Sequence, residues 1–276
     1  MESQMDLQAH YGATDLEAKV ERVLEQSGLG GQPIDWRTLA PLDQFHVRGL
    51  AASEELAEGL GLEPGVSVLD VGCGLGGPAR YLAAAFGCQV TGIDLNPGFV
   101  GVARMLAERT GLAAKTSFRQ ADALDPPFAD ASFDHAWTQH VAMNIEDKAA
   151  LYRSIHRVLR PGGRLAIYDV IAGDGGPLIF PVPWAGTPDI SFLATPETMH
   201  RDLADAGFTE RAWSDKTEQG LAWFAEQQVA RQAGQAPGPL GLQVVMGPQM
   251  AIMATNLARN IAEGRARLVQ VIAARL

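Results

Sequence analysis

Cysteine, basic residues and long apolar runs are all scarce in this sequence. Its 276 residues include two cysteines, Cys73 and Cys88, which give neither a disulfide framework nor metal-ligand spacing. Lysine and arginine total 22 against 32 acidic residues, a formal net charge of −10 that argues against nucleic-acid binding. No apolar run approaches the roughly 20 residues of a membrane-spanning helix, and no signal-peptide pattern opens the chain. We therefore expect a cytoplasmic protein with reduced cysteines that binds no metal, nucleic acid or membrane.

What the sequence does contain is a regular alternation of apolar strands and amphipathic helices. Five short segments read as strands: GVSVLDVG, CQVTGIDL, KTSFRQAD, SFDHAWTQ and RLAIYDVI. Helices are expected between them near residues 76–86, 98–110 and 146–159. This alternation predicts a parallel, doubly wound sheet. Beyond it we expect a helix near 196–206, a strand near 208–215, a helix in GPQMAIMATNLARNIAEG and a closing strand, ARLVQVIAARL.

The stretch DVGCGLGGPARYL follows the first predicted strand and is rich in glycine. Gly72, Gly74 and Gly77 fit the dinucleotide pattern G-x-G-x-x-G. Asp70, Gly72, Gly74 and Gly76 equally fit an acid-led pattern that is typical of binding S-adenosylmethionine (SAM). In both cases the glycines let the chain turn sharply and bring the backbone close to a ligand at a helix start. The loop alone therefore leaves both ligands open.

Three further features favour SAM. The carboxylate of Asp70 would repel a pyrophosphate but attract the ammonium and sulfonium groups of SAM. Asp122, at the end of the third strand, is suited to accept a hydrogen bond from an adenine amino group. After five strands the chain does not repeat a second nucleotide-binding half. Asp94, at the end of the second strand, does not discriminate, because a carboxylate there would hold ribose hydroxyls in either case.

Four motifs carry a family resemblance. VLDVGCGLGGPARYLA, VTGIDL, ADALDPPFADASFD and RVLRPGGRLAIYDV resemble, in order and spacing, the motifs of class I SAM-dependent methyltransferases over about residues 64–170. Within that superfamily the chain is similar to the small-molecule group of ubiquinone/menaquinone-biosynthesis, sterol, sarcosine/dimethylglycine and sugar O-methyltransferases. LDQFHVRG resembles the segment that this group carries just before the core.

The resemblance implies an α/β, Rossmann-like fold with a seven-stranded, mostly parallel sheet whose last strand is antiparallel. It also implies SAM as cofactor and a small-molecule acceptor methylated at oxygen, nitrogen or carbon. Two alternatives stay open: a protein of this fold that binds SAM without methyl transfer, and an NAD-dependent oxidoreductase. A homo-oligomeric state is also open.

The same resemblance assigns the cofactor site residue by residue. Its members are Tyr11, Asp70, Gly72, Gly74, Gly76, Asp94, Leu95, Asp122, Ala123 and Gln139. Asp94 would hold the ribose, and Leu95 would pack against the adenine beside Asp122 and Ala123. Gly72, Gly74 and Gln139 would lie at the methionine end. Tyr11 would lie against the sulfonium, unless it is an ordinary packing tyrosine.

Catalytic candidates are few. His140 follows the fourth strand and Asp169 ends the fifth, and these strand ends meet at the carboxyl edge of a parallel sheet. An aspartate beside a histidine orients the imidazole and stabilises its protonated form. The pair would thus serve as a general base for a hydroxyl acceptor. The alternative is that His140 only forms part of the pocket wall.

Acceptor-binding candidates lie outside the strand ends. We expect residues 1–62 to form a helical lid and residues 63–276 to form the methyltransferase domain, with an inserted cap. Segments near 172–195 and 217–248 would cover the acceptor. His46 on the lid, and Phe180 and Trp184 in IFPVPW, would bind it, although a structural histidine and core aromatics are equally compatible. Three methionines have the spacing of one helix face: Met246, Met250 and Met253. They could belong either to the helix core or to the wall of the acceptor pocket.

Overall fold

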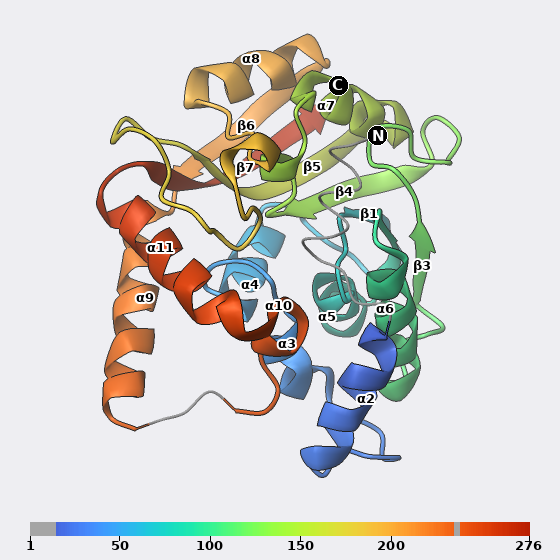
Figure 1. Cartoon of the computed structure of the whole chain (residues 1–276). Helices are drawn as coiled ribbons and strands as arrows, with labels where there is room; N and C mark the ends of the chain where they lie inside the picture. Colours follow the sequence, from blue (N-terminus) through green and yellow to red (C-terminus); the bar gives the residue numbers. More distant parts are fainter. Residues whose placement is uncertain (1–14, 235–237) are drawn as a thin grey trace.

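A single seven-stranded sheet organises the molecule (Figure 1). The computed structural model describes residues 15–234 and 238–276. The strands are β1 (Ser67–Val71), β2 (Gln89–Asp94), β3 (Thr116–Gln120), β4 (Phe133–Gln139), β5 (Leu159–Ala172), β6 (Phe208–Asp215) and β7 (Ala266–Arg275). Their order is β3-β2-β1-β4-β5-β7-β6. The first five pair in parallel, and β7 runs antiparallel to both β5 and β6. The predicted fold class is confirmed.

Helices cover both faces of the sheet. They are α2 (Leu16–Gln26), α3 (Ala40–Asp43), α4 (Leu50–Glu58), α5 (Gly77–Phe86), α6 (Pro97–Arg109), α7 (Lys148–Val158), α8 (Pro196–Asp205), α9 (Thr217–Gln232), α10 (Gln243–Met246) and α11 (Met250–Ala262). Short 3₁₀ turns are η1 (Trp36–Leu39), η2 (Ala142–Asn144), η3 (Pro188–Ile190) and η4 (Gly247–Gln249). None of the described helices has the length and apolar character needed to cross a membrane.

Side chains alternate between the two faces of the sheet along each strand. This alternation determines which helices the last side chains of each strand contact. On β4 and β5, Trp137 and Tyr168 pack into a buried cluster with residues of α4, α5 and α11. Ile167 and Ile171 pack on the opposite face, with residues of α7 and α8. Neighbouring residues of β5 therefore lie on opposite sides of the sheet.

Two boundaries differ from the sequence prediction. The fifth strand begins at Leu159 rather than near residue 164, but its pairing with β4 passes from Leu159 directly to Arg164, so RPGG bulges out of the ladder. Residues 217–232 form the helix α9, for which no helix was expected. Its face pattern is weak, since Gly220 is its one buried residue.

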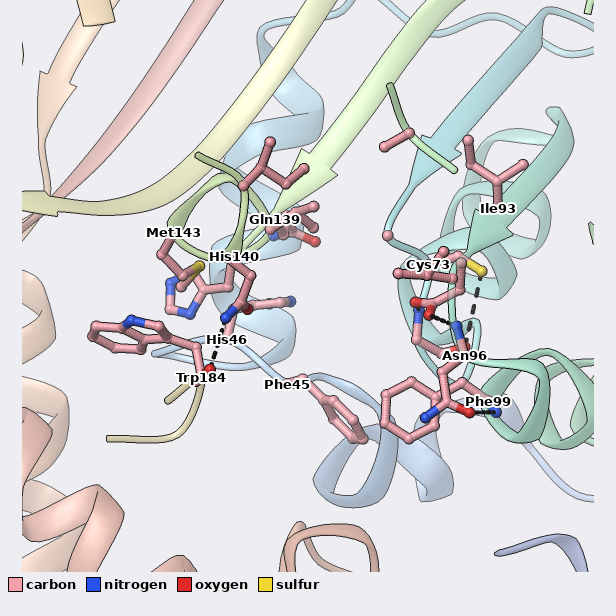
Figure 2. Close-up of a pocket in the computed structure, with 18 of the residues that line it drawn as sticks. Phe45, His46, Cys73, Ile93, Asn96, Phe99, Gln139, His140, Met143 and Trp184 are labelled. Carbon is pink, nitrogen blue, oxygen red and sulfur yellow. Dashed lines mark hydrogen bonds between the residues drawn. The ribbon is translucent and has the colours of Figure 1, made fainter. Parts of the chain in front are cut away.

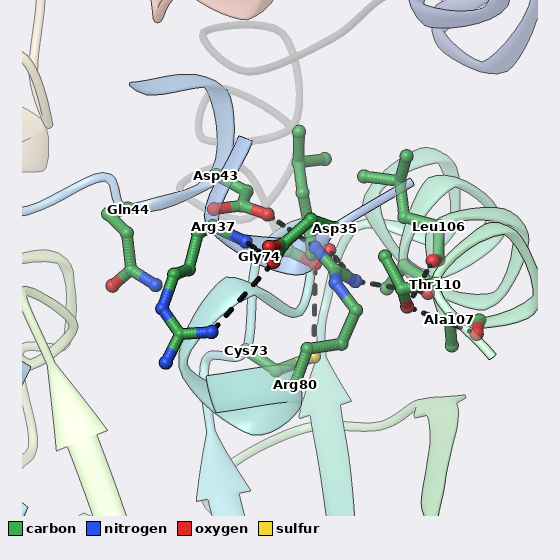
Figure 3. A network of polar contacts seen from close by, with 12 residues as sticks. Asp35, Arg37, Asp43, Gln44, Cys73, Gly74, Arg80, Leu106, Ala107 and Thr110 are labelled. Carbon is green, nitrogen blue, oxygen red and sulfur yellow. Dashed lines mark hydrogen bonds and ion pairs between the residues drawn. The ribbon is translucent and has the colours of Figure 1, made fainter. Parts of the chain in front are cut away.

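The described part of the expected lid packs against the sheet domain at two points. Leu16, Val20 and Leu24 of α2 are buried against α6 in a shared apolar cluster. Asp43, the last residue of α3, forms an ion pair with Arg80 of α5 at 2.6 Å (Figure 3). Both side chains are almost wholly buried. Breaking such a buried pair costs about 3–5 kcal/mol. Residues 1–14, and with them Tyr11, lie outside the described part of the chain, so the division at residue 62 stays a prediction.

Candidate active site

The carboxyl ends of β1, β2, β3 and β4 open into a cavity of about 490 Å³. Volumes of about 300–1,000 Å³ are usual for small-molecule sites. Figure 2 shows two groups of lining residues. Cys73, Ile93, Asn96 and Phe99 lie at one end, which we call the loop end. His46, Gln139, His140, Met143 and Trp184 lie at the other, which we call the histidine end. Phe45 lies between them.

Asp94 organises the loop end. Its Oδ2 accepts a hydrogen bond from the Gly74 backbone N–H at 2.9 Å, and its Oδ1 accepts one from the Asn96 N–H at 2.8 Å. The Asn96 side chain in turn caps α6 by accepting from the N–H groups of Gly98 and Phe99. One carboxylate thus fixes both the glycine loop and the start of α6 while it lines the cavity. Burial raises its pKa.

Two predicted glycines belong to this end of the cavity. Gly74 has a φ of +51°, and a Cβ added there would find only the Phe45 ring, at 3.8 Å. Its backbone therefore faces open space in which a ligand can approach closely. Gly72 has a φ of +70°, and a Cβ there would overlap the side chain of Val141. A side chain at Gly72 would push the loop away from the strand end of β4.

The assignment of Gly76 to the cofactor needs correction. A Cβ at Gly76 would lie 2.7 Å from the Phe118 ring of β3, and Gly76 is not among the residues that line the cavity. Its φ of +75° places it at the N-terminal cap of α5. Gly76 therefore permits the turn into α5 and close packing on β3.

Asp70 offers the clearest binding position for a positively charged group. The side chain is only 2% exposed and lines the cavity, and its Oδ2 has no hydrogen-bond partner among the described residues. Burial, and then repulsion from Asp94, raise its pKa to about 8. A buried carboxylate oxygen without a donor is costly unless a ligand supplies one. This environment fits the positively charged methionine end of SAM.

The raised pKa predicts a pH dependence of SAM affinity. Below pH 8 the free protein holds a proton on Asp70, and binding a cation against the carboxylate must release it. The affinity should therefore rise with pH toward 8, by up to about tenfold per pH unit. Isothermal titration calorimetry on the wild type and Asp70→Asn would measure this.

The Asp70→Asn variant also serves as the reference for the ligand's own amino group, which titrates near the same pH. The variant should show weaker binding at pH 8 and a flatter profile. Identical pH profiles for the two proteins would contradict the assignment of Asp70.

The remaining predicted cofactor residues also line the cavity. Leu95, Asp122 and Ala123 follow β2 and β3, and the Asp122 Oδ1 accepts from the Leu124 N–H at 2.9 Å. Gln139, the last residue of β4, accepts hydrogen bonds through Oε1 from the Trp137 indole N–H at 2.9 Å and the Ser53 hydroxyl at 3.2 Å. These contacts hold the Gln139 side chain at the histidine end.

His140 lies at the histidine end in a strained backbone conformation. Its φ is +54°, which is uncommon for a residue other than glycine and is often found at functional sites. Its N–H donates to the Tyr168 carbonyl at 2.8 Å, and its ring lies 5.2 Å from the Tyr168 ring and 6.0 Å from His46. The Nε2 atom is buried and has no hydrogen-bond partner among the described residues.

Both histidines are electrically neutral near pH 7. Burial, and then the neighbouring His46, hold the pKa of His140 well below its usual value. Burial lowers the pKa of His46 to about 4. The His46 Nε2 lies 3.0 Å from Gln44 Oε1, while its Nδ1 has no partner within the described residues. Two neutral imidazoles can accept a proton or a hydrogen bond but cannot neutralise an anion.

The structure does not bring Asp169 to His140. Asp169 is offset by one residue from Tyr168 on β5, so its side chain lies on the face that packs against α7 and α8. Its Oδ2 accepts from the Ala142 N–H at 3.1 Å and its Oδ1 from the Val170 N–H at 3.2 Å. Burial raises its pKa to about 7, and Lys148 of α7 opposes the rise. The predicted orienting pair is therefore wrong, and Tyr168 occupies the position beside the imidazole.

Of the predicted acceptor residues, His46 and Trp184 line the cavity and Phe180 does not. Trp184 is 2% exposed, and its indole N–H donates to Ser191 at 2.9 Å. Phe180 packs instead against the main apolar core, so its assignment needs correction. The three methionines differ in location: Met246 and Met250 line the cavity, whereas Met253 is buried in the core.

Several lining residues were not predicted. They are Phe45, Cys73, Asn96, Phe99, Val141, Met143, Asn144, Phe192 and Leu242, among others. The position of Phe45 next to His46 in LDQFHVRG was an available signal. Asn96 before Pro97 is a helix-start signature that also marks the edge of the site. The remaining apolar residues had no local signal, since only the tertiary fold brings them to the cavity.

Comparison with known proteins identifies the class. Residues 69–167 match the family described as "Methyltransferase domain". The chain is 41% identical over 128 residues to the sterol 24-C-methyltransferase ERG6B of Gibberella zeae, covering 46% of this chain and 34% of that protein. It is 34% identical over 181 residues to phosphoethanolamine N-methyltransferase 1 of Arabidopsis thaliana, covering 62% and 34%. The chain thus spans about a third of the length of these two curated relatives.

Solved structures extend the likeness over the whole chain. The cyclase SpnF is 27% identical with a TM-score of 0.68, covering 99% of this chain and 96% of that chain. A geranyl diphosphate C-methyltransferase from Streptomyces coelicolor A3(2) shares the fold at 18% identity with a TM-score of 0.72, covering 100% and 99%. Residues 69–167 therefore carry a methyltransferase domain, and the chain shares the fold of a methyltransferase of known structure.

Proposed function

We propose that the protein transfers a methyl group from SAM to an oxygen, nitrogen or carbon atom of a small molecule. One observation carries the proposal: a single cavity joins the glycine loop, the unsatisfied carboxylate of Asp70 and a neutral His140. The first two fit a cationic cofactor, and the third fits a group that removes a proton. A cavity of about 490 Å³ is continuous between the two ends.

Binding roles follow from the geometry at the loop end. Asp94 would bind the ribose hydroxyls with the carboxylate edge that its backbone contacts leave accessible. Asp70 would bind the ammonium group, and the Gly74 backbone would lie against the methionine part. Leu95, Asp122 and Ala123 would enclose the adenine. Tyr11 stays a prediction, as it lies outside the described residues.

Chemistry would take place at the histidine end. SAM supplies a methyl group on a positively charged sulfur, which an acceptor atom attacks in line. The protein has to align the acceptor and, where it is a hydroxyl, take its proton. The buried His140 Nε2 is available for that proton, and His46 and Trp184 would contact the acceptor. The apolar side chains of Phe45, Met143 and Trp184 would limit the access of water to the reacting groups.

A second candidate is a protein that binds SAM without methyl transfer. The likeness to SpnF supports this candidate. SpnF has the same fold over nearly the whole chain, but it is named as a cyclase and not as a methyltransferase. Thermal-shift measurements with SAM and NAD, followed by mass spectrometry of products from amines, sugars, phenols and quinols, would test both. Protection by SAM with release of S-adenosylhomocysteine supports the proposal. Protection without product would support the second candidate, and protection by NAD alone would overturn both.

The segment before the sheet should close over bound cofactor. Asp43, Phe45 and His46 line the cavity, and the Asp43–Arg80 ion pair anchors this segment to α5. Lids of this kind sequester the reacting groups from water. Hydrogen exchange in peptides spanning residues 36–50 should slow when S-adenosylhomocysteine is added.

Residues 217–232 provide the internal control for that measurement, because α9 contributes no residue to the cavity lining. Exchange there should change little. Equal exchange in 36–50 with and without ligand would rule out a lid. A cytoplasmic location and a homo-oligomeric state stay predictions.

A further inference from the structure

The charged residues around the cavity restrict the electrical charge that the acceptor can carry. No lysine or arginine is among the described residues that line it. The sequence adds that residues 1–14 and 235–237 contain neither residue type, so those segments have no such cation to offer. The two lining histidines are neutral near pH 7 because burial lowers the pKa of each. An anionic acceptor would thus meet no lysine, arginine or charged histidine in the described wall of the cavity.

The acidic residues that line the cavity make an anion still less favourable. Asp94 lies at the loop end beside Asp70, which holds a proton below about pH 8, and Asp43 is paired with Arg80. Glu146 and Asp147 lie exposed at the rim. Among the described residues, no group of three or more His, Cys, Asp or Glu is placed to hold a metal ion without help from a ligand. Like charges at the entrance lower the local concentration of an anionic ligand.

The wall of the histidine end is apolar and deformable. Met143 and Trp184 lie at this end (Figure 2) with Phe192, whose backbone N–H donates to the Met143 carbonyl, while Phe45, Leu242, Met246 and Met250 line other parts of the same cavity. Methionine side chains adapt to irregular apolar surfaces. The polar atoms at this end are uncharged: the His140 Nε2, the His46 Nδ1 and the Gln139 amide nitrogen are all buried without partners in the described part of the chain. A neutral polar group on an apolar body would satisfy both features.

We propose that the acceptor is an electrically neutral molecule with a large apolar part, whose reacting polar group meets the uncharged histidine end. This inference rests on the proposed methyl transfer and narrows it. It separates the chain from its relatives named for phosphoethanolamine and geranyl diphosphate, because a phosphate group would be desolvated here without a cation. The distinction lies in residues of the cavity wall and not in the shared cofactor motifs.

Displacement of a neutral dye tests the proposal directly. The full chain, loaded with S-adenosylhomocysteine, is titrated with Nile red and then with geraniol or geranyl diphosphate, with and without Mg²⁺. These two competitors share one apolar chain and differ in charge. Nile red should bind, and geraniol should displace it at a concentration about tenfold or more below that of the diphosphate, since desolvating an unpaired anion is costly. Equal or better displacement by the diphosphate would contradict the proposal that the acceptor is neutral. Failure of Nile red to bind would contradict the proposal that the acceptor has a large apolar part.

A charge placed in the wall provides the matched variant. Met250→Lys adds a cation to the lining, whereas Ile252→Lys adds one on the exposed side of the same helix, where the residue is 48% exposed. Geranyl diphosphate should displace the dye from Met250→Lys at a lower concentration than from the wild type, and Ile252→Lys should behave as the wild type does. The same gain in both variants would mean that the diphosphate binds elsewhere, which also overturns the proposal.

Failure of this inference can be distinguished from failure of the proposed function. Calorimetry of S-adenosylhomocysteine binding comes first and does not depend on the acceptor. No binding at that step overturns the methyltransferase proposal itself. Binding followed by preference for the diphosphate leaves methyl transfer standing and overturns only the neutral acceptor.

Discussion

Asp94→Ala should weaken SAM binding about 10²–10⁴-fold. In the proposed complex the carboxylate accepts two hydrogen bonds from ribose hydroxyls, and each charge-assisted bond contributes about 1.5–3 kcal/mol. The same side chain holds the Gly74 and Asn96 N–H groups, so its loss also releases the glycine loop from the start of α6. Both effects act in the same direction. Isothermal titration calorimetry of SAM and S-adenosylhomocysteine would measure the loss.

Two further variants make the result specific. Asp125→Ala removes an exposed acid three residues beyond Asp122, outside the cavity lining, and should leave the affinity unchanged. Asp94→Asn keeps one acceptor oxygen but removes the charge, so it should fall between the wild type and Asp94→Ala. Each protein must first give a native circular dichroism spectrum. An Asp94→Ala protein that binds SAM as the wild type does would show that this carboxylate serves the loop alone.

Much of the loop end could be predicted because its residues follow from local rules. Parallel strands present their carboxyl ends at one edge, so Asp70, Asp94 and Asp122 could be brought together from the strand pattern alone. All three line the cavity. The glycine loop was predictable for the same reason, although Gly76 was assigned to the cofactor when it packs on Phe118. The spacing of glycines says where the chain turns but not which of them faces the ligand.

The histidine end was less predictable because it depends on tertiary structure. The sequence places Asp169 near the end of β5, but only the pleat decides that Tyr168 meets His140 while Asp169 turns to α7. A difference of one residue changes the face, and the strand boundary could not be fixed that closely. Phe45, Met143, Phe192 and Leu242 come from segments far apart in the chain, so no single motif could have indicated them.

His140→Ala should reduce kcat about 10²–10⁴-fold on a hydroxyl acceptor, the range that general-base help contributes. The affinity for SAM should change little, because His140 lies at the end of the cavity away from Cys73 and Asn96 (Figure 2). His140→Gln preserves size and polarity but cannot take up a proton, so it should be nearly as slow. His200→Ala, on the exposed side chain that pairs with Glu210, is the control and should be as active as the wild type.

The pH profile separates a base from a pocket wall. Burial holds the pKa of His140 well below the ordinary histidine value, so the imidazole stays deprotonated, and able to accept a proton, at pH 7 and somewhat below. With saturating SAM and a hydroxyl acceptor, wild-type kcat/KM for the acceptor should therefore stay flat as pH falls from 8 through 6.5, the usual pKa of histidine, and decline only at lower pH. The His140→Ala enzyme should be slow throughout, because burial lowers the pKa of His46, the other imidazole at this end, to about 4 and makes it a much weaker base.

A neutral amine acceptor would give a different pattern, since its proton can leave to water before the methyl group is transferred. The loss in His140→Ala would then be small, and raising the pH would restore most of it by increasing the neutral fraction of the amine. Measuring kcat against pH for wild type, His140→Ala and His140→Gln on the identified acceptor distinguishes these cases. Full activity of His140→Ala on a hydroxyl acceptor at every pH would remove the base role. His140 would then remain a wall residue whose buried Nε2 hydrogen-bonds to the acceptor without taking its proton.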